Sequence, residues 1–319
     1  MDLMPDELIP AHLGDPTADA PQPDLQTAPV PVPSTRRGIA PVWHTIVLVV
    51  GILGFSIWGS IRAGTPDLNP LAPVHSATHA DTANGTDHAR LIRYGLTGVL
   101  ELTIVAWVAL GLRIRRTPFR TLLGALPHDL NSGTLEAGVA LAFWLCSMGV
   151  LASTAFTWQF VANQIYDHQV KSQAHDPSHA HAKTESPLQK QTEMARELMQ
   201  LAPANGVELA AWGFLCVLVG FCEELVFRGY LQSQSIALLH RIPISVVLAS
   251  LIFGAAHGYQ GIRGICIISV YGALFSCLTL LRRSLFPGML AHTWHDFATG
   301  LLLAFLRSSH ILEHLPPPK

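Results

Sequence analysis

Three short clusters of ionisable residues lie inside strongly apolar stretches of the last third of the chain. They are Glu223-Glu224 with Arg228, Phe253 with His257, and His292 with His295 and Asp296. An ionisable side chain within an apolar span is costly to keep there, and by default it points to function. Carboxylates and imidazoles exchange protons with bound water, so these residue types suggest hydrolysis.

The first cluster places an acid and a base four residues apart. On a helix, Glu224 and Arg228 would share a face, with the acid before the base, which is the favourable order. In a low dielectric, pairing keeps both side chains charged. Glu223 would lie about 100° further round the helix, so it is the freer carboxylate and could take a proton from water. A structural ion pair with a merely solvated Glu223 is the plain alternative.

The other two clusters are each open to a plain structural interpretation. His257 shares a helix face with Phe253, and the small residues between them permit close approach of another helix. A lone histidine in this setting could instead be a satisfied core residue. His292 and Asp296 also share a face, but after Pro287-Gly288 they could be capping groups at a helix start.

The first two clusters become more specific when they are taken together. The break at Arg241–Pro243 predicts an antiparallel hairpin, with Glu223 19 residues before position 242 and His257 15 residues after it. At about 1.5 Å per residue, the two side chains lie within about 6 Å of the same depth and form a water-activating pair. Alternatively, Glu223, His257 and His292 could bind zinc with an open fourth position. Helix counting leaves His292 near the membrane face opposite His257.

The composition is that of a membrane protein. Of the 319 residues, 50% are hydrophobic and only 13% are charged, against about 25% charged in an ordinary soluble domain. The net charge of −2 gives no bulk field that would attract nucleic acid, so no nucleic-acid partner is expected. We predict an all-α fold, a multi-pass transmembrane helical bundle with about seven spans in a lipid bilayer.

Seven apolar stretches approach or exceed the length of about 20 residues that a spanning helix needs. They lie near 42–61, 91–112, 135–160, 207–227, 244–257, 262–281 and 286–306. Around them, the sequence predicts a disordered Pro-rich tail at 1–40, three N-terminal transmembrane spans within 41–162, a polar His-rich loop at 163–205 with a short helix near 193–200, a transmembrane domain at 206–307 and a tail at 308–319. The arginines at 36–37, 113–120 and 282–283 favour the cytoplasmic side.

The three clusters, in this order and on apolar helices, resemble the motifs of the CPBP family. This family includes the type II CAAX prenyl endoproteases and the bacterial Abi proteins. The matching motifs are Glu-Glu-x-x-x-Arg at 223–228, Phe-x-x-x-His at 253–257 and His-x-x-x-Asp at 292–296. The resemblance covers about residues 205–306, so it makes 206–307 a CAAX protease-like catalytic domain.

The resemblance implies an intramembrane endopeptidase that cleaves a peptide bond in a membrane-associated protein or peptide. Glu223 would activate the water with help from His257, and Glu224 with Arg228 would order the site. Such a protein is expected to be an integral multi-pass protein of a bacterial cytoplasmic membrane.

The resemblance also implies that His292 and Asp296 line the oxyanion side of the site. Asparagine is commoner in the family at the position of Asp296, and an anionic Asp is a poorer donor to an oxyanion. The family is often named as metalloproteases, although a metal-free, glutamate-activated water has also been argued. Zinc is therefore an open expectation.

Two other functions stay open from the sequence. Family members can act as non-catalytic membrane scaffolds or immunity-type proteins while keeping the enzyme's motifs. Histidines at 168, 175, 179 and 181 also suit loose metal binding, which would fit a metal-ion transporter. Against transport, Arg228 follows Glu224 by one helical turn and would repel a cation.

Overall fold

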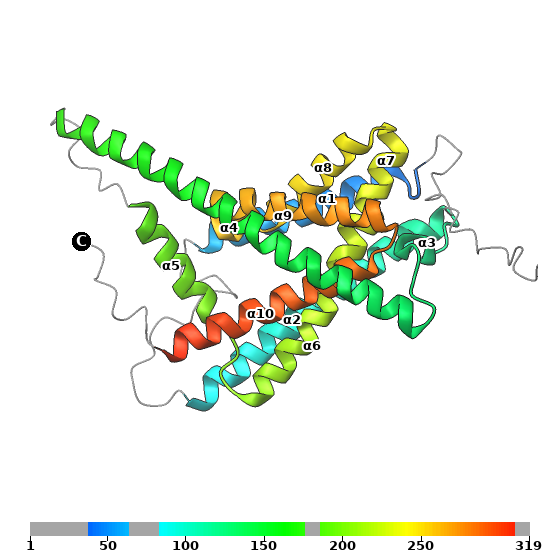
Figure 1. Cartoon of the computed structure of the whole chain (residues 1–319), viewed down its shortest axis with the longest axis horizontal. Helices are drawn as coiled ribbons and strands as arrows, with labels where there is room; N and C mark the ends of the chain where they lie inside the picture. Colours follow the sequence, from blue (N-terminus) through cyan, green and yellow to red (C-terminus); the bar gives the residue numbers. More distant parts are fainter. Residues whose placement is uncertain (1–37, 64–82, 176–185, 310–319) are drawn as a thin grey trace, which may run out of the picture.

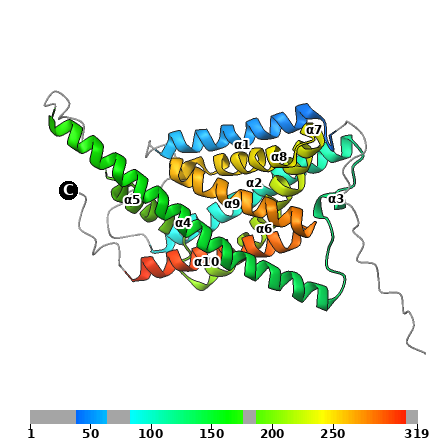
Figure 2. The same ribbon diagram turned by 45° about the horizontal axis from the view of Figure 1, so that its top comes forward.

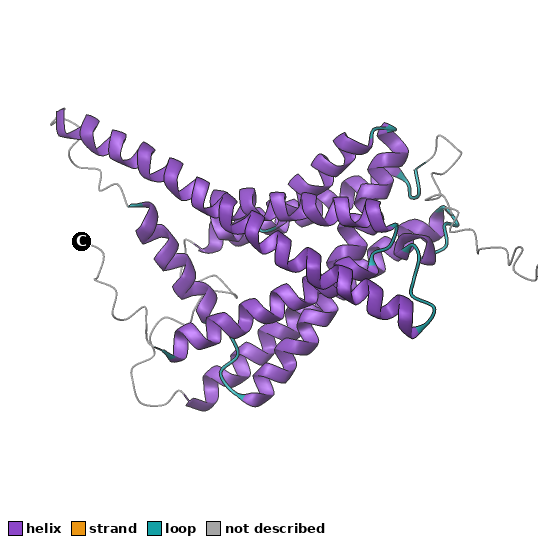
Figure 3. Cartoon of the chain, in the orientation of Figure 1, coloured by secondary structure: helices purple, strands orange, loops and turns teal. Residues whose placement is uncertain are grey.

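The computed structural model describes residues 38–63, 83–175 and 186–309, and these are helical almost throughout (Figures 1 and 3). In chain order the helices are α1 (Val42–Ala63), α2 (Ala83–Ile114), α3 (Arg120–Leu123), α4 (Leu130–His175), α5 (Pro187–Met199), α6 (Gly206–Glu223), a π-helix (Glu224–Gln232), α7 (Ser233–Leu239), α8 (Ile242–Ala256), a 3-10 turn (Gly258–Gln260), α9 (Gly261–Arg282) and α10 (Phe286–Ser308). The predicted all-α class is confirmed.

Five of these helical stretches are long and apolar enough to cross a membrane. They are Val42–Ile61, His88–Ile114, Leu130–Ser172, Gly206–Leu239 and Gly258–Arg282. Two further spans predicted from sequence correspond to α8, an apolar helix of 15 residues, and to α10, which carries the third ionisable cluster. The chain is therefore an integral membrane bundle, and the count of seven depends on these two helices.

The segment predicted as a polar loop at 163–205 is helical over much of its length. Helix α4 continues to His175, and its far end extends beyond the other helices (Figure 1). Adding residues to an existing helix avoids the cost of nucleation, so polar residues continue it readily. The short helix expected near 193–200 is α5, and a capping box between Ser186 and Gln189 begins it earlier, at Pro187.

The end of the predicted disordered tail is folded. Residues 1–37 lie outside the described part of the chain, but Ile39 and Ala40 are buried. The backbone N–H of Ala40 donates to Gln234 Oε1 at 3.1 Å. Gln234 Nε2 donates back to the carbonyl of Ala40 at 2.9 Å. These two hydrogen bonds attach the start of α1 to α7. Because Ile39 and Ala40 are also buried there, the folded region begins before residue 41.

Helices α2 and α6 run side by side in the same direction (Figure 1). Arg90 Nε donates to Glu208 Oε2 at 2.8 Å, and the rings of Tyr94 and Trp212 meet at 5.4 Å. Both pairs are 118 positions apart, so the register is constant along the two helices. Gly98 lets the two helices stay close further along, because a Cβ there would lie 3.2 Å from a methyl group of Leu218.

Helices α1, α8 and α9 form a row on one side of the bundle (Figure 2). Glycine allows the closest approach between α8 and α9: a Cβ on Gly254 would lie 2.5 Å from the carbonyl oxygen of Ile265. The small residues before His257 therefore allow another helix to approach closely, as the sequence predicted. Gly220 has the same role between α6 and α10, where a Cβ would lie 3.0 Å from the carbonyl of Met289.

Two of the arginine-rich segments meet at one end of the bundle. The backbone of Gly124 pairs with that of Ser284 in an isolated bridge, so the connection after α2 lies against the connection after α9. The hydroxyl of Thr117 donates to the carbonyl of Ile39 at 3.0 Å, which brings the start of the described chain to the same end. This placement agrees with a common side for the arginines at 113–120 and 282–283, and Arg36-Arg37 lie outside the described residues.

Candidate active site

The Glu-Glu-x-x-x-Arg motif lies where α6 changes into a π-helix. The sequence predicted an α-helix through this region, but residues Glu224–Gln232 form a π-helix, and all nine are buried. π-Helical turns are rare and are often found at functional sites. They bond residue i to i+5 and rise less per residue than an α-helix. Residues before this segment therefore lie closer to its far end than α-helical counting assumes.

Glu224 is the fully buried carboxylate of the pair. Its Oε1 lies 3.0 Å from Arg228 Nη1, and the two side chains are 0% and 1% exposed. The same oxygen lies 3.0 Å from His292 Nδ1. A buried carboxylate needs such partners, because an unpaired charge in low dielectric is strongly unfavourable. The predicted pairing of Glu224 with Arg228 is present in this structure.

Arg228 is held by aromatic rings as well as by its ion pair. Its guanidinium carbon lies 4.2 Å from the ring centroid of Phe253 and 5.1 Å from that of Phe275. Its Nη2 donates to the carbonyl of Gly272 at 3.4 Å. A guanidinium stacks favourably on ring faces, particularly where water is excluded. Arg228 is thus a fixed charge that positions Glu224, and it is closed off from a substrate.

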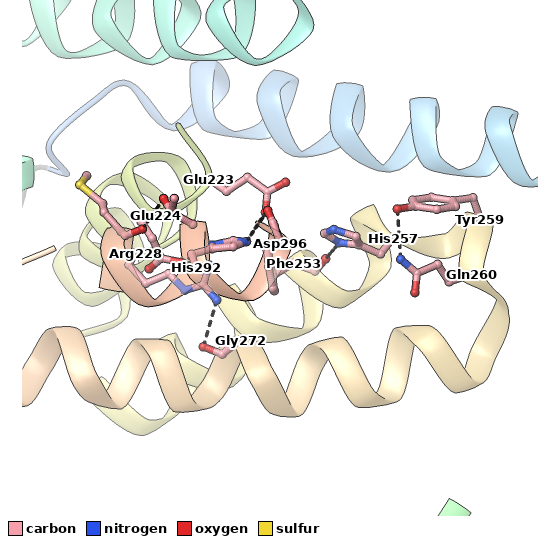
Figure 4. Close-up of polar contacts among 12 residues, drawn as sticks. Glu223, Glu224, Arg228, Phe253, His257, Tyr259, Gln260, Gly272, His292 and Asp296 are labelled. Carbon is pink, nitrogen blue, oxygen red and sulfur yellow. Dashed lines mark hydrogen bonds and ion pairs between the residues drawn. The ribbon is translucent and has the colours of Figure 1, made fainter. Parts of the chain in front are cut away.

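Glu223 is the more accessible of the two glutamates (Figure 4). Its side chain is 14% exposed, and its Oε2 lies 3.5 Å from His292 Nε2. The other carboxylate, Glu224, is committed to both Arg228 and His292. Glu223 therefore has an oxygen that can accept a proton or hold a water, as its position around the helix predicted.

His292 joins the third cluster to the first. Its Nδ1 faces Glu224, and its Nε2 lies 3.5 Å from Glu223 and 3.8 Å from Asp296 Oδ2. The ring is only 5% exposed. Three carboxylates around one imidazole stabilise its cationic form.

Helix counting placed His292 at the wrong depth. Helix α10 begins beside the site: a Cβ on Gly288, in its first turn, would lie 3.2 Å from Glu224 Oε2. One more helical turn then brings His292 to the glutamates. Counting failed because it assumed that α10 starts at the membrane face and not next to Glu224.

His257 is hydrogen-bonded to the backbone one helical turn before it, and its pairing with Glu223 stays a prediction. Its Nδ1 lies 2.9 Å from the carbonyl oxygen of Phe253, so this nitrogen carries the hydrogen and Nε2 is the acceptor. In the described part of the chain, its hydrogen bond goes to that carbonyl and not to Glu223. The Phe253 ring lies 5.0 Å from the His257 ring and 6.2 Å from the His292 ring. The imidazole in direct contact with Glu223 is His292.

Glu101 is a further acid at the site, contributed by α2. The register of α2 against α6 brings it about one helical turn short of Glu223, and it interacts electrostatically with Glu223, His292 and Asp296. In the sequence, Glu101 is an acid well inside the apolar run at 91–112. The cost of keeping an acid inside a membrane span is the signal that could have assigned Glu101 to the site, but no motif links it to the three clusters.

The predicted zinc ligands do not fit a metal ion as they are arranged. Glu223 and His292 face each other directly, whereas Nδ1 of His257 is bonded to the carbonyl of Phe253. Among the described residues, no group of three or more His, Cys, Asp or Glu is placed to hold a metal.

Comparison with known proteins gives one match. Residues 205–298 match the family model described as type II CAAX prenyl endopeptidase Rce1-like, which confirms the resemblance to the CPBP family for this segment. Searches of curated proteins and of solved structures found no match. The matched segment contains all three clusters, whereas α1, α2 and α4 lie outside it.

Proposed function

We propose that this chain, which carries a type II CAAX prenyl endopeptidase Rce1-like domain over residues 205–298, is an intramembrane endopeptidase that cleaves a membrane-associated protein or peptide. One observation carries the proposal. Of two consecutive glutamates in the bundle, Glu224 is neutralised by Arg228, and Glu223 remains 14% exposed beside His292. A poised, accessible carboxylate of this kind suits a general base.

The reaction follows from these positions. Glu223 takes a proton from a bound water as the water oxygen attacks the scissile carbonyl carbon, and the carbonyl electrons move to its oxygen. When the tetrahedral intermediate collapses, the C–N bond breaks, and the carboxyl of Glu223 returns its proton to the leaving nitrogen. Proton transfers of this type contribute roughly 10²–10⁴-fold to rate.

The two histidines support Glu223 differently. His292 lies against Glu223 and Glu224 together, so it fixes the base relative to the buried ion pair. His257 directs Nδ1–H to the carbonyl of Phe253, which leaves Nε2 to accept the second hydrogen of the water. This division adds His292 to the Glu223–His257 pair expected from helix counting.

The substrate is expected to lie in or on the bilayer, because the site sits among membrane-spanning helices. We place the protein in a bacterial cytoplasmic membrane as part of the proposal. The test compares peptide N-termini in membranes from cells that express the wild type or Glu223→Gln. Termini that depend on Glu223 identify the cleaved protein and its site.

A purified preparation completes the test. Wild type and Glu223→Gln are reconstituted in lipid nanodiscs with a synthetic peptide that spans the cleavage site. Glu223→Gln should lose more than about 100-fold in rate while keeping the same melting temperature. A scaffold or immunity role would be favoured if the two proteins produced the same set of termini and the same rates.

A further inference from the structure

The motif residues leave one requirement of the proposed reaction unmet. A tetrahedral intermediate carries a negative oxygen, which needs hydrogen-bond donors. Nδ1 of His292 is bonded to Glu224, and its Nε2, 3.5 Å from Glu223 and 3.8 Å from Asp296, supplies one donor when the ring is cationic. Asp296 as an anion has no hydrogen to donate. The Nδ1–H of His257 is used by Phe253, and Arg228 is buried in its ion pair. A second donor must come from outside the motifs.

Tyr259, two residues after His257, has a hydroxyl hydrogen available. Its oxygen accepts a hydrogen bond from Gln260 Nε2 at 3.1 Å, so its own hydrogen points elsewhere. The side chain is 43% exposed and can meet a substrate. Its ring lies 6.1 Å from that of His257, and the hydroxyl end turns toward His257 and Asp296 (Figure 4). It interacts electrostatically with Glu223 and Asp296.

The turn that carries Tyr259 is fixed by a helix outside the family match. Ser56 of α1 accepts from the N–H of Gly258 at 3.0 Å and donates to the carbonyl of Ala255 at 2.6 Å. A Cβ on Gly258 would lie 2.7 Å from the Ser56 oxygen, so the turn is pressed against α1. A donor stabilises a transition state best when it is already in place. The contact with Ser56 holds the turn that carries Tyr259 in one position.

We propose that the hydroxyl of Tyr259 is a catalytic donor that stabilises the oxyanion of the tetrahedral intermediate. Its O–H stays intact and donates a hydrogen bond to the oxygen that gains the carbonyl electrons, while Glu223 carries the water proton. The proposal rests on the proposed peptidase function and adds to it a residue that no motif contains. It also gives α1 a part in catalysis, through Ser56 and the turn.

The test replaces Tyr259 by phenylalanine in the full chain, in nanodiscs, with the synthetic peptide that spans the Glu223-dependent cleavage site. Loss of one oxyanion donor lowers kcat by about 10²–10³-fold, and KM should change little, since the donor acts on the intermediate. The phosphinate analogue of the peptide, which mimics the tetrahedral centre, should bind Tyr259→Phe at least about tenfold more weakly than wild type.

Gln260→Leu is the matched control. It removes the same Tyr259–Gln260 hydrogen bond but keeps the hydroxyl, so kcat should stay near that of wild type. Equal losses in Tyr259→Phe and Gln260→Leu would mean that the bond only shapes the turn, and the proposal would then be overturned.

Failure of this proposal can be told apart from failure of the peptidase function. If Glu223→Gln is inactive and Tyr259→Phe cleaves as fast as wild type, only the role of Tyr259 is wrong. If Glu223→Gln is as active as wild type, the peptidase assignment itself is wrong. In an Asp296→Asn background, where an amide offers a new donor, the penalty of Tyr259→Phe should shrink.

Discussion

Nδ1 of His292 lies 3.0 Å from Oε1 of Glu224, although 68 positions separate the two residues in the chain. The contact joins α10 to the start of the π-helix. Arg228 and His292 together hold Glu224, whereas Glu223 keeps an accessible oxygen for catalysis.

Glu224→Gln should destabilise the protein, in contrast to Glu223→Gln. Removing the charge of Glu224 leaves Arg228 buried without its anion, and breaking a buried pair in this way costs about 3–5 kcal/mol. Thermal unfolding in detergent should therefore show a large decrease in melting temperature for Glu224→Gln only. Equal melting temperatures for the two variants would contradict the assignment of Glu224 as the structural partner.

Gly254→Ala should weaken the contact between α8 and α9. The new Cβ would lie 2.5 Å from the carbonyl of Ile265, and overpacking of this kind costs about 1–3 kcal/mol. Gly149→Ala in α4 is the control, because a Cβ there meets nothing within 4 Å and alanine favours a helix. The melting temperature should decrease for the first variant and stay level or increase for the second.

Glu101→Gln should lower activity without unfolding the protein. It removes one of the carboxylates that surround the cationic groups near Glu223, and it changes no more than one atom of the side chain. We expect a loss of at least about tenfold in kcat, of the size seen for electrostatic groups near a reaction centre. Glu136→Gln, which alters the ion pair with Arg282 far along the bundle, should retain wild-type kcat.

His44→Leu tests how α1 is attached to the π-helix. His44 is 0% exposed, with Nδ1 3.0 Å from the hydroxyl of Tyr230 and Nε2 2.9 Å from the carbonyl of Trp107. Loss of each of these hydrogen bonds costs about 0.5–1.5 kcal/mol. Tyr230→Phe removes the same bond to His44, together with the bond of Tyr230 to Thr45, so the double variant should be less destabilised than the sum of the single variants. Strict additivity of the melting shifts would argue against a direct bond.

The lengths of the apolar stretches and the spacing within the motifs predicted much of the fold and part of the site. Hydropathy located the apolar part of each helix, because a bilayer demands long apolar segments, but not the polar turns by which α2 and α4 extend beyond it. Spacing also indicated the pair of Glu224 with Arg228, since neighbours on a helix are set by local geometry. Both features depend on short stretches of chain, which is why sequence alone could supply them.

Features that depend on contacts between distant segments were not predictable. The π-helix at Glu224–Gln232 shortens the distance along the helix axis between the residues before it and those after it. No residue type in the sequence indicates a π-helix there. The contact of His292 with Glu223 depends on where α10 begins relative to the site, which is set by packing at Gly220 and Gly288. The position of Glu101 relative to the site depends on how α2 packs against α6, which the sequence does not show.

The Phe253 ring packs near both imidazoles of the site, at 5.0 Å from the ring of His257 and 6.2 Å from that of His292. A hydrocarbon ring has no lone pair and no acidic hydrogen, so it cannot relay a proton. The contacts of Phe253 therefore carry no proton from one histidine to the other, and such exchange needs water or another polar group that reaches both rings. Phe253 is thus a packing partner that the two histidines share and not part of a proton path.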